Sequence, residues 1–291
     1  MVCLPKDKLS HKVRSISELD LAGTLTGVAG LIGFNFAWNE GPVAGWQAPY
    51  TIVMLIIGVA LLLAFVYLEL SVVTDPLLPR MAFTLDTSLV LGCIAAGWSS
   101  FGIWVFYYWQ FLEVIRGDSI LQSAAEMCPA AVSGAIAAVA TGMLMRKMTT
   151  GTILVCSMVA FCMGIVLVVS NPPGRTYWAQ LFLSPIITSW GMDMSFPAGV
   201  IVLSYHMPHH QQGLAASLVN TVVNYSISVG LGFAGTAERY VVLNGADQLE
   251  GYRAALYVGI SLDVLGLILA AGLVIHQRLQ LKQNSAQTID G

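Results

Sequence analysis

The 291-residue sequence has few charged residues and no long basic run. Only 10% of its residues are charged and 56% are hydrophobic, whereas a soluble domain carries about 25% charged residues. The charged side chains are therefore too few to cover a water-facing surface, which excludes a soluble globular protein. The formal net charge of −3 and the lack of basic stretches exclude nucleic acid as a partner.

Signatures of enzymes and metal centres are also absent from the sequence. It contains no phosphate-binding P-loop, GxSxG or HExxH motif. A membrane enzyme is therefore the least favoured class, and no cofactor is expected. The five cysteines form no CxxC pair and are interpreted as small packing residues. The segment YHMPHHQQG gathers His206, His209 and His210, but it offers no fourth ligand, so no metal site is expected.

The sequence contains long apolar runs. A hydrocarbon core of about 30 Å requires about 20 apolar residues in a helix, and about eight runs approach that length. Because no backbone polar group can go unpaired in lipid, each run must be helical. The sequence therefore predicts an all-α, polytopic membrane helix bundle of about eight transmembrane helices. The runs are Leu21–Trp38, Pro49–Leu70, Leu85–Phe111, Gln122–Met145, Thr152–Val169, Trp178–Ser204, Leu214–Ala234 and Ala254–His276.

The distribution of Lys and Arg predicts the orientation, because positively charged short loops stay in the cytoplasm. With the N-terminus inside, the cytoplasmic side holds nine of the 13 basic residues and the other side holds four. Residues 1–20 are thus predicted to be a cytoplasmic N-terminal segment, 71–84 a cytoplasmic loop and 277–291 a cytoplasmic tail. The nine are Lys6, Lys8, Lys12, Arg14, Arg80, Arg146, Lys147, Arg278 and Lys282, and the four are Arg116, Arg175, Arg239 and Arg253.

Three carboxylates lie about one helical turn or more inside the ends of the apolar runs: Asp193, Asp263 and Glu126. A carboxylate at bilayer depth costs at least about 2.5 kcal/mol, so each is a candidate functional residue. None has an intramembrane Lys or Arg as a partner. We interpret them as proton-coupling candidates that exchange a proton as the bundle rearranges. The alternative is a structural carboxyl that is protonated or bonded to an amide.

The sixth run contains two prolines, Pro185 and Pro197, with Gly191 between them. Proline removes a backbone hydrogen bond and bends a helix, so the sequence predicts a broken helix that acts as a hinge. Interrupted helices near the bilayer midplane are where transporters bind substrate. A purely structural kink is the alternative.

The seventh run carries polar side chains on one helical face. Asn220 and Asn224 are four residues apart and share that face with Ser217 and Ser228. Such a stripe either joins helices through polar contacts or lines a substrate path. We therefore treat Ser217, Asn220 and Asn224 as substrate-path candidates.

The third run contains the aromatic string WVFYYWQF, with Trp104 and Tyr108. Aromatic side chains at the ends of spans commonly anchor a helix at the membrane interface. This string is denser than anchoring requires. As the alternative to anchoring, part of the string lines a pocket for a flat or greasy ligand, so Trp104 and Tyr108 are also substrate-path candidates.

Several strings resemble fungal members of the major facilitator superfamily: GLIGFNFAWNEGPVAGWQAPY, DPLLPR, WGMDMSFPAG and QQGLAASLVNTVVNYSISVGLGFAGT. More narrowly, they resemble the fourteen-helix drug:proton antiporter branch, which includes aminotriazole-resistance-type proteins. The resemblance runs from about Leu19 to His276. It implies that residues 21–70 are the family's extra central pair of helices and residues 85–276 its C-terminal six-helix half. The N-terminal half has no counterpart in this sequence.

Arg146 and Lys147, in GMLMRKMTTG, resemble a degenerate copy of the family's conformational loop. The resemblance gives these two residues a role in latching conformational states. They are equally explained as ordinary cytoplasmic positive charges.

The resemblance implies a multi-pass transporter of the plasma membrane that couples protons to efflux of a small amphipathic molecule, such as a fungal secondary metabolite or toxic compound. The partners expected are a small-molecule substrate, protons and the lipid bilayer. Because the family's cavity lies between two six-helix halves, transport would also need a homodimer or a complementary N-terminal half. The alternative is a truncated half-transporter without independent activity, left by a shortened gene or a misassigned start.

Overall fold

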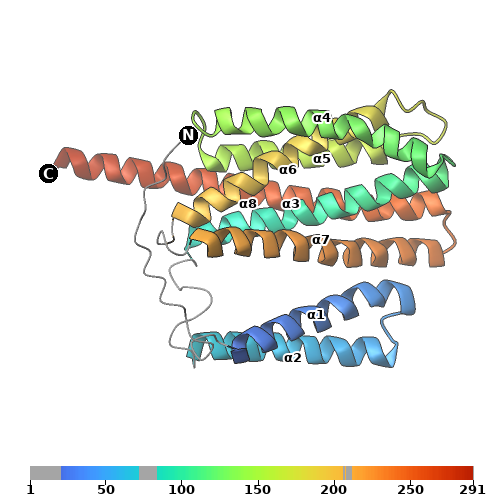
Figure 1. The fold of residues 1–291 in the computed structure, drawn as a ribbon, viewed down its shortest axis with the longest axis horizontal. Helices are drawn as coiled ribbons and strands as arrows, with labels where there is room; N and C mark the ends of the chain where they lie inside the picture. The colour runs from blue at the N-terminus through green and yellow to red at the C-terminus, as the bar shows by residue number, and fades with distance from the viewer. Residues whose placement is uncertain (1–20, 72–83, 206, 208–211, 291) are drawn as a thin grey trace, which may run out of the picture.

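The computed structural model describes residues 21–71, 84–205, 207 and 212–290, and every regular element in these ranges is a helix (Figure 1). Eight of the described helices are long and apolar enough to cross a membrane. The predicted all-α membrane bundle is therefore confirmed. The helices are α1 (Leu21–Ala44), α2 (Pro49–Ser71), α3 (Leu85–Gln110) with a π-helical turn η3 (Phe111–Ile115), α4 (Ile120–Leu144), α5 (Thr150–Val169), α6 (Gln180–Tyr205), α7 (Gln212–Leu243) and α8 (Gln248–Asp290).

Three helices continue well past the ends of their apolar runs. The run that predicts α1 ends at Trp38, but the helix continues to Ala44. The run that predicts α7 ends at Ala234, but the helix continues to Leu243. The run that predicts α8 ends at His276, but the helix continues to Asp290. Hydropathy measures only the part of a helix that lies in hydrocarbon, whereas backbone hydrogen bonding continues into the polar turns beyond it. The three predicted ends are therefore too early.

Hydroxyl side chains fix where three of the helices begin. Thr84 accepts a hydrogen bond from the backbone N–H of Thr87 at the start of α3. Ser119 and Thr149 act in the same way at the starts of α4 and α5. Each hydroxyl satisfies a backbone donor that has no partner inside the helix. The chain therefore starts each of these helices at a defined residue.

Helices α3 to α8 form one bundle, with α3 packed against α5, α6, α7 and α8 (Figure 1). Its core consists of two apolar clusters. The first surrounds Met158 and Phe161 of α5, and the second surrounds Tyr107, Tyr108 and Phe111. Helix α4 lies at the edge of the bundle against α6. Its outer face exposes Val132, Ile136, Val139 and Met143, as expected for a helix that borders lipid or another protein unit.

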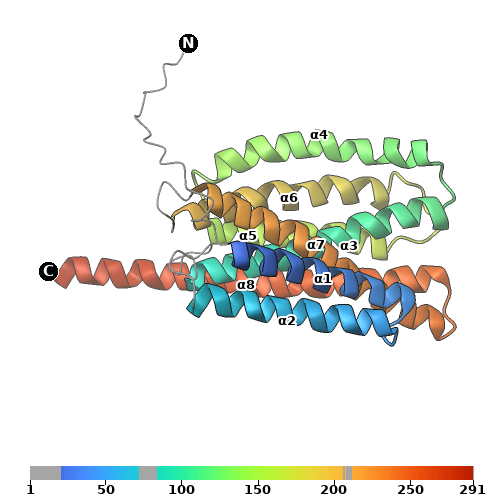
Figure 2. The same cartoon turned by 60° about the horizontal axis from the view of Figure 1, so that its bottom comes forward.

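Helices α1 and α2 form an antiparallel pair that lies beside α7 (Figure 2). Every buried residue of α1 is glycine or alanine, which allows the two backbones to approach closely. On α2, a Cβ at Gly58 would lie 2.3 Å from the backbone nitrogen of Phe34. This close approach therefore requires glycine at position 58.

Gly58→Ala is expected to destabilise the protein by about 1–3 kcal/mol, the usual cost of overpacking a tight interface. The added methyl group meets backbone atoms of α1, which cannot rotate away. Thermal unfolding in detergent measures the effect. Gly142→Ala is the matched control, because nothing lies within 4 Å of a Cβ there. Equal unfolding temperatures for the two variants would show that α1 and α2 do not pack as described.

Small residues also bring α7 close to its neighbours. Gly230, Gly232 and Gly235 follow the spacing GxGxxG, but they lie inside a helix that follows no strand. A Cβ at Gly232 would lie 2.3 Å from Cδ1 of Trp38, and one at Gly230 would lie 2.7 Å from the backbone oxygen of Ser99. These glycines therefore serve helix packing and not nucleotide binding.

Candidate functional site

Helix α6 is continuous from Gln180 to Tyr205, with both prolines inside it. The prediction of a broken helix is therefore wrong for the backbone in this conformation. Pro185 has no N–H to donate to the carbonyl oxygen of Leu181. The hydroxyl of Tyr108 donates to that oxygen instead, at 3.1 Å. A side chain of α3 thus satisfies the acceptor that the proline leaves free.

The aromatic residues of α3 form a seam along α6. The indole N–H of Trp104 donates to Ser184 Oγ at 2.8 Å, and Ser184 in turn donates to the backbone oxygen of Gly164 on α5. About three turns further along α6, Trp98 donates to Ser195 Oγ at 3.1 Å. Trp104 and Tyr108 are 3% and 0% exposed. In this conformation both predicted substrate-path residues lie in the helix interface.

Tyr108→Phe is expected to lower the unfolding free energy by about 1–3 kcal/mol, because the Leu181 oxygen becomes a buried acceptor without a donor. The measurement is thermal unfolding of the purified protein. Tyr257→Phe, which removes a hydroxyl from an exposed position, is expected to change nothing. A loss in the control as large as that in Tyr108→Phe would contradict the assigned role.

Asp263 of α8 is the most deeply buried carboxyl of the described chain, with an exposed fraction of 0%. Ser100 of α3 donates its hydroxyl to Asp263 Oδ2 at 2.6 Å. The other oxygen, Oδ1, has no partner among the described residues. Burying a charge without compensation is costly, so this carboxyl is suited to carry a proton.

Asp193 of α6 lies in a different interface. It is half-buried, and no hydrogen bond from the described residues reaches its carboxyl group. Its Oδ2 faces α4, where a Cβ at Gly134 would lie 3.2 Å away. The structure therefore places Asp193 between α4 and α6, and Asp263 between α3 and α8. The two candidate proton carriers do not form one pair.

The polar stripe of α7 is exposed along two turns, at Ser217, Asn220, Thr221 and Asn224. Asn224 Nδ2 donates to the backbone oxygen of Asn220 at 2.8 Å, and Thr221 Oγ1 donates to that of Ser217 at 2.9 Å. These bonds all lie within α7. Polar side chains at membrane depth face protein or water and not lipid. This face of α7 therefore requires a cover that the described helices do not supply.

Further along the same face, α1 covers the stripe. Ser228 donates to Asn35 Oδ1 at 2.8 Å, and Asn39 Nδ2 donates to Ser228 Oγ at 3.0 Å. The Trp38 indole donates to the backbone oxygen of Val229 at 3.0 Å. The sequence reasoning missed both asparagines of α1. Their spacing of four residues, as in the pair on α7, was the available signal.

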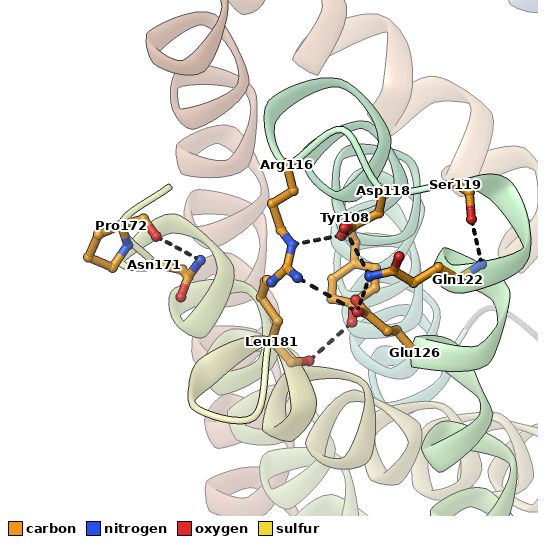
Figure 3. A network of polar contacts seen from close by, with 9 residues as sticks. All are labelled: Tyr108, Arg116, Asp118, Ser119, Gln122, Glu126, Asn171, Pro172 and Leu181. Carbon is orange, nitrogen blue, oxygen red and sulfur yellow. Dashed lines mark hydrogen bonds and ion pairs between the residues drawn. The ribbon is translucent and has the colours of Figure 1, made fainter. Parts of the chain in front are cut away.

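Glu126 has an ion-pair partner that was not predicted from the sequence. Arg116, just after the π-helical turn, places Nη2 3.7 Å from Glu126 Oε1 (Figure 3). Arg116 Nε lies 2.7 Å from Asp118 Oδ2, and Gln122 Nε2 bridges the two carboxylates. The carboxylate is therefore part of a charged network at the end of the bundle, apart from Asp193 and Asp263.

Comparison with known proteins identifies relatives of this chain. No protein-family model matches the chain. It is 54% identical to the low affinity ammonium transporter of Saccharomyces cerevisiae, over 91% of this chain and 51% of the relative. It is 41% identical to the aminotriazole resistance protein of the same yeast, over 87% and 47%. It is 34% identical to a major facilitator superfamily multidrug transporter of Aspergillus fumigatus, over 98% and 48%.

The chain is a homologue of fungal major facilitator superfamily transporters. The resemblance predicted from its sequence is therefore confirmed, and these relatives are transporters and not enzymes. With eight candidate membrane spans in the described residues, the chain is a multi-pass membrane protein. It spans about half the length of the curated relatives that it matches.

Two predicted features of this major facilitator homologue lie on turns. Arg146 and Lys147, between α4 and α5, are exposed and make no side-chain hydrogen bond or ion pair with a described residue. Their latching role stays a prediction. The histidines His206, His209 and His210 lie outside the described residues. Within the described part, no group of His, Cys, Asp and Glu is arranged to hold a metal ion.

Proposed function

We propose that this major facilitator homologue takes part in proton-coupled efflux of a small amphipathic molecule. The observation that carries the proposal is the exposed polar face of α7, which places two amides at membrane depth without a cover. On the helical wheel, Leu214 and Tyr225 lie next to Thr221 at one edge of this polar face and are half-buried. Such a face offers hydrogen bonds beside apolar surface, which suits an amphipathic substrate.

In this proposal, Asp193 and Asp263 carry the proton. One or the other carboxyl takes up a proton from the outer side and releases it to the cytoplasm as substrate enters the cavity. The neutral form of a carboxyl removes the cost of burying a charge, so the exchange can accompany a change in helix packing. Pro185, Pro197 and Gly191 give α6 the positions at which it would bend, and Tyr108 would then release the Leu181 oxygen.

The proposal also covers topology and assembly. Helices α1 and α2 correspond to the family's central pair, and α3 to α8 to its C-terminal half. Both termini lie in the cytoplasm and the protein resides in the plasma membrane. The turn with Arg146 and Lys147 lies at the same end of the bundle as the end of α8 (Figure 1), which supports one basic cytoplasmic side.

The uncovered face of α7 also favours a second candidate, a non-transporting half-transporter without independent activity. In the main proposal, a second copy of the chain or a complementary six-helix half covers this face and closes the substrate path. The efflux direction is supported by two relatives that are named for aminotriazole resistance and multidrug transport. A third is named for ammonium transport, so the relatives' names do not define one substrate.

Accumulation of fluorescent amphipathic compounds in cells that lack their own drug pumps tests the proposal. The chain is expressed alone and together with the part of the aminotriazole resistance protein that it does not match. When the chain is expressed with the added part of the aminotriazole resistance protein, accumulation should fall, and a protonophore should reverse the fall. The same result is expected for the chain alone if two copies of it pair. Unchanged accumulation in both arms, with insertion confirmed, would favour the inactive unit.

A further inference from the structure

A second polar centre lies at the end of the bundle where α3 passes into α4. The π-helical turn ends with the Arg116 N–H donating to the Phe111 oxygen at 3.1 Å. Gly117 then reverses the chain with φ of +74°, a conformation that favours glycine. Ser119 caps α4 immediately afterwards. This short connection holds the Arg116 side chain over the first turns of α4, and π-helical turns frequently mark functional positions.

Three buried polar atoms at this end of the bundle have no partner among the described residues: Arg116 Nη1, Glu126 Oε2 and Asn171 Oδ1. Figure 3 shows Asn171 and Glu126 on opposite sides of the Arg116 side chain. Buried polar atoms in proteins are nearly always hydrogen-bonded to protein, water or a ligand. The unmatched atoms of Arg116 and Glu126, which belong to one ion pair, therefore indicate that the centre receives further hydrogen bonds.

The charges of the centre do not balance. Arg116 lies close to Asp118, at 2.7 Å, and farther from Glu126, at 3.7 Å. One guanidinium against two carboxylates leaves one negative charge uncompensated, and the distances place it on Glu126. The nearby Arg175 is exposed and bonds Gln180 Oε1 at 3.3 Å. The unmatched carboxylate oxygen thus favours a cation.

A pocket of about 510 Å³ opens onto this carboxylate. Its walls include Arg116, Glu126, Pro129, Tyr177 and Trp178. Tyr177 donates its hydroxyl to the backbone oxygen of Glu126 at 2.6 Å. Burial and then the neighbouring Glu126 raise the pKa of Tyr177 to about 12, so its ring stays neutral. Trp178 is 73% exposed, and an exposed indole face can bind a cation.

We propose that this pocket is a binding site for a small organic cation. Its ammonium group pairs with the Glu126 carboxylate, and an acceptor atom beside the ammonium receives a hydrogen bond from the Arg116 guanidinium. Its apolar or aromatic body packs against Trp178 and Pro129. The site is separate from the α7 face and from both carboxyls in the proton-coupling proposal. It therefore stands whether or not the chain transports.

Equilibrium dialysis of the full chain in detergent, with radiolabelled 2-phenylethanolamine as the probe, tests the site. This probe combines a ring, an ammonium group and a hydroxyl oxygen. Saturable binding is expected, and Glu126→Gln should weaken it about ten-fold or more, as expected for loss of a charge-assisted hydrogen bond. Glu113→Gln is the matched control, because Glu113 lies on the π-helical turn just before Arg116, is exposed and does not line the pocket.

Trp178→Ala gives a second test, because an exposed side chain can be removed without loss of folding. It is expected to weaken binding several-fold, and phenylacetate, which replaces the cation by an anion, should not compete. Equal binding by Glu126→Gln and Glu113→Gln would overturn the proposal. Competition by phenylacetate would also overturn it. If Glu126→Gln does not fold, unchanged binding by Trp178→Ala would overturn the proposal instead.

Discussion

Asp193→Asn is expected to abolish proton-coupled export and to leave folding and membrane insertion largely intact. Asparagine has nearly the same shape as aspartate but cannot release a proton. The described structure shows no hydrogen bond to the Asp193 carboxyl, so the substitution removes no packing contact that α6 requires. Export across an imposed pH gradient measures the effect, with the amount of protein in the membrane determined in parallel.

Asp247→Asn is the matched control for this variant. Asp247 is exposed in the turn before α8 and accepts a hydrogen bond from the Glu250 N–H at 2.9 Å, a role that asparagine fills equally well. It is expected to export normally. Asp263→Asn should also lose coupling. Unchanged transport by Asp193→Asn across a pH gradient would remove Asp193 from the mechanism.

The double substitution Asn220→Leu and Asn224→Leu is expected to eliminate export while the protein remains folded. Both amides are exposed, and their hydrogen bonds stay within α7. Leucine keeps the helix and makes this face as apolar as a lipid-facing one, so a water-lined path could no longer form along it. Compound accumulation in pump-deficient cells and thermal unfolding in detergent measure the two expectations.

Ser261→Val controls for the loss of a polar group on an exposed helix face. Ser261 of α8 is exposed and bonds only the backbone oxygen of Tyr257, at 2.9 Å. Its replacement should leave export unchanged. If the double leucine variant exports normally, the stripe is not part of the substrate path. If it fails to fold, the stripe serves helix association instead.

The number of spans could be predicted from the sequence because apolar length alone decides whether a helix crosses the hydrocarbon. The ends of α7 and α8 could not, because helix hydrogen bonds continue through polar residues such as Glu238 and Gln280. The cap residues Ser119 and Thr149 mark the starts of their helices to within a residue or two. They were visible in the sequence but were not used.

Only the part of the candidate site that lies on a single helix could be predicted from the sequence. The stripe of α7 followed from the spacing of its asparagines, and the structure places those amides on one exposed face. The support of Pro185 by Tyr108 could not be predicted, because it joins the Leu181 oxygen to a side chain 73 residues away in sequence. The many aromatic residues of α3 suggested a ligand pocket. In the structure these rings pack against α6, a contact that the sequence of α3 alone does not specify.

Uptake into proteoliposomes with an imposed pH gradient tests the central claim most directly. The chain is reconstituted alone and with the complementary part of a relative, and the fluorescent compound that gives the largest effect in cells is followed together with internal pH. The account predicts that the compound and protons move in opposite directions and that Asp193→Asn stops both. Compound movement that is independent of the pH gradient, with correctly inserted protein, would contradict it.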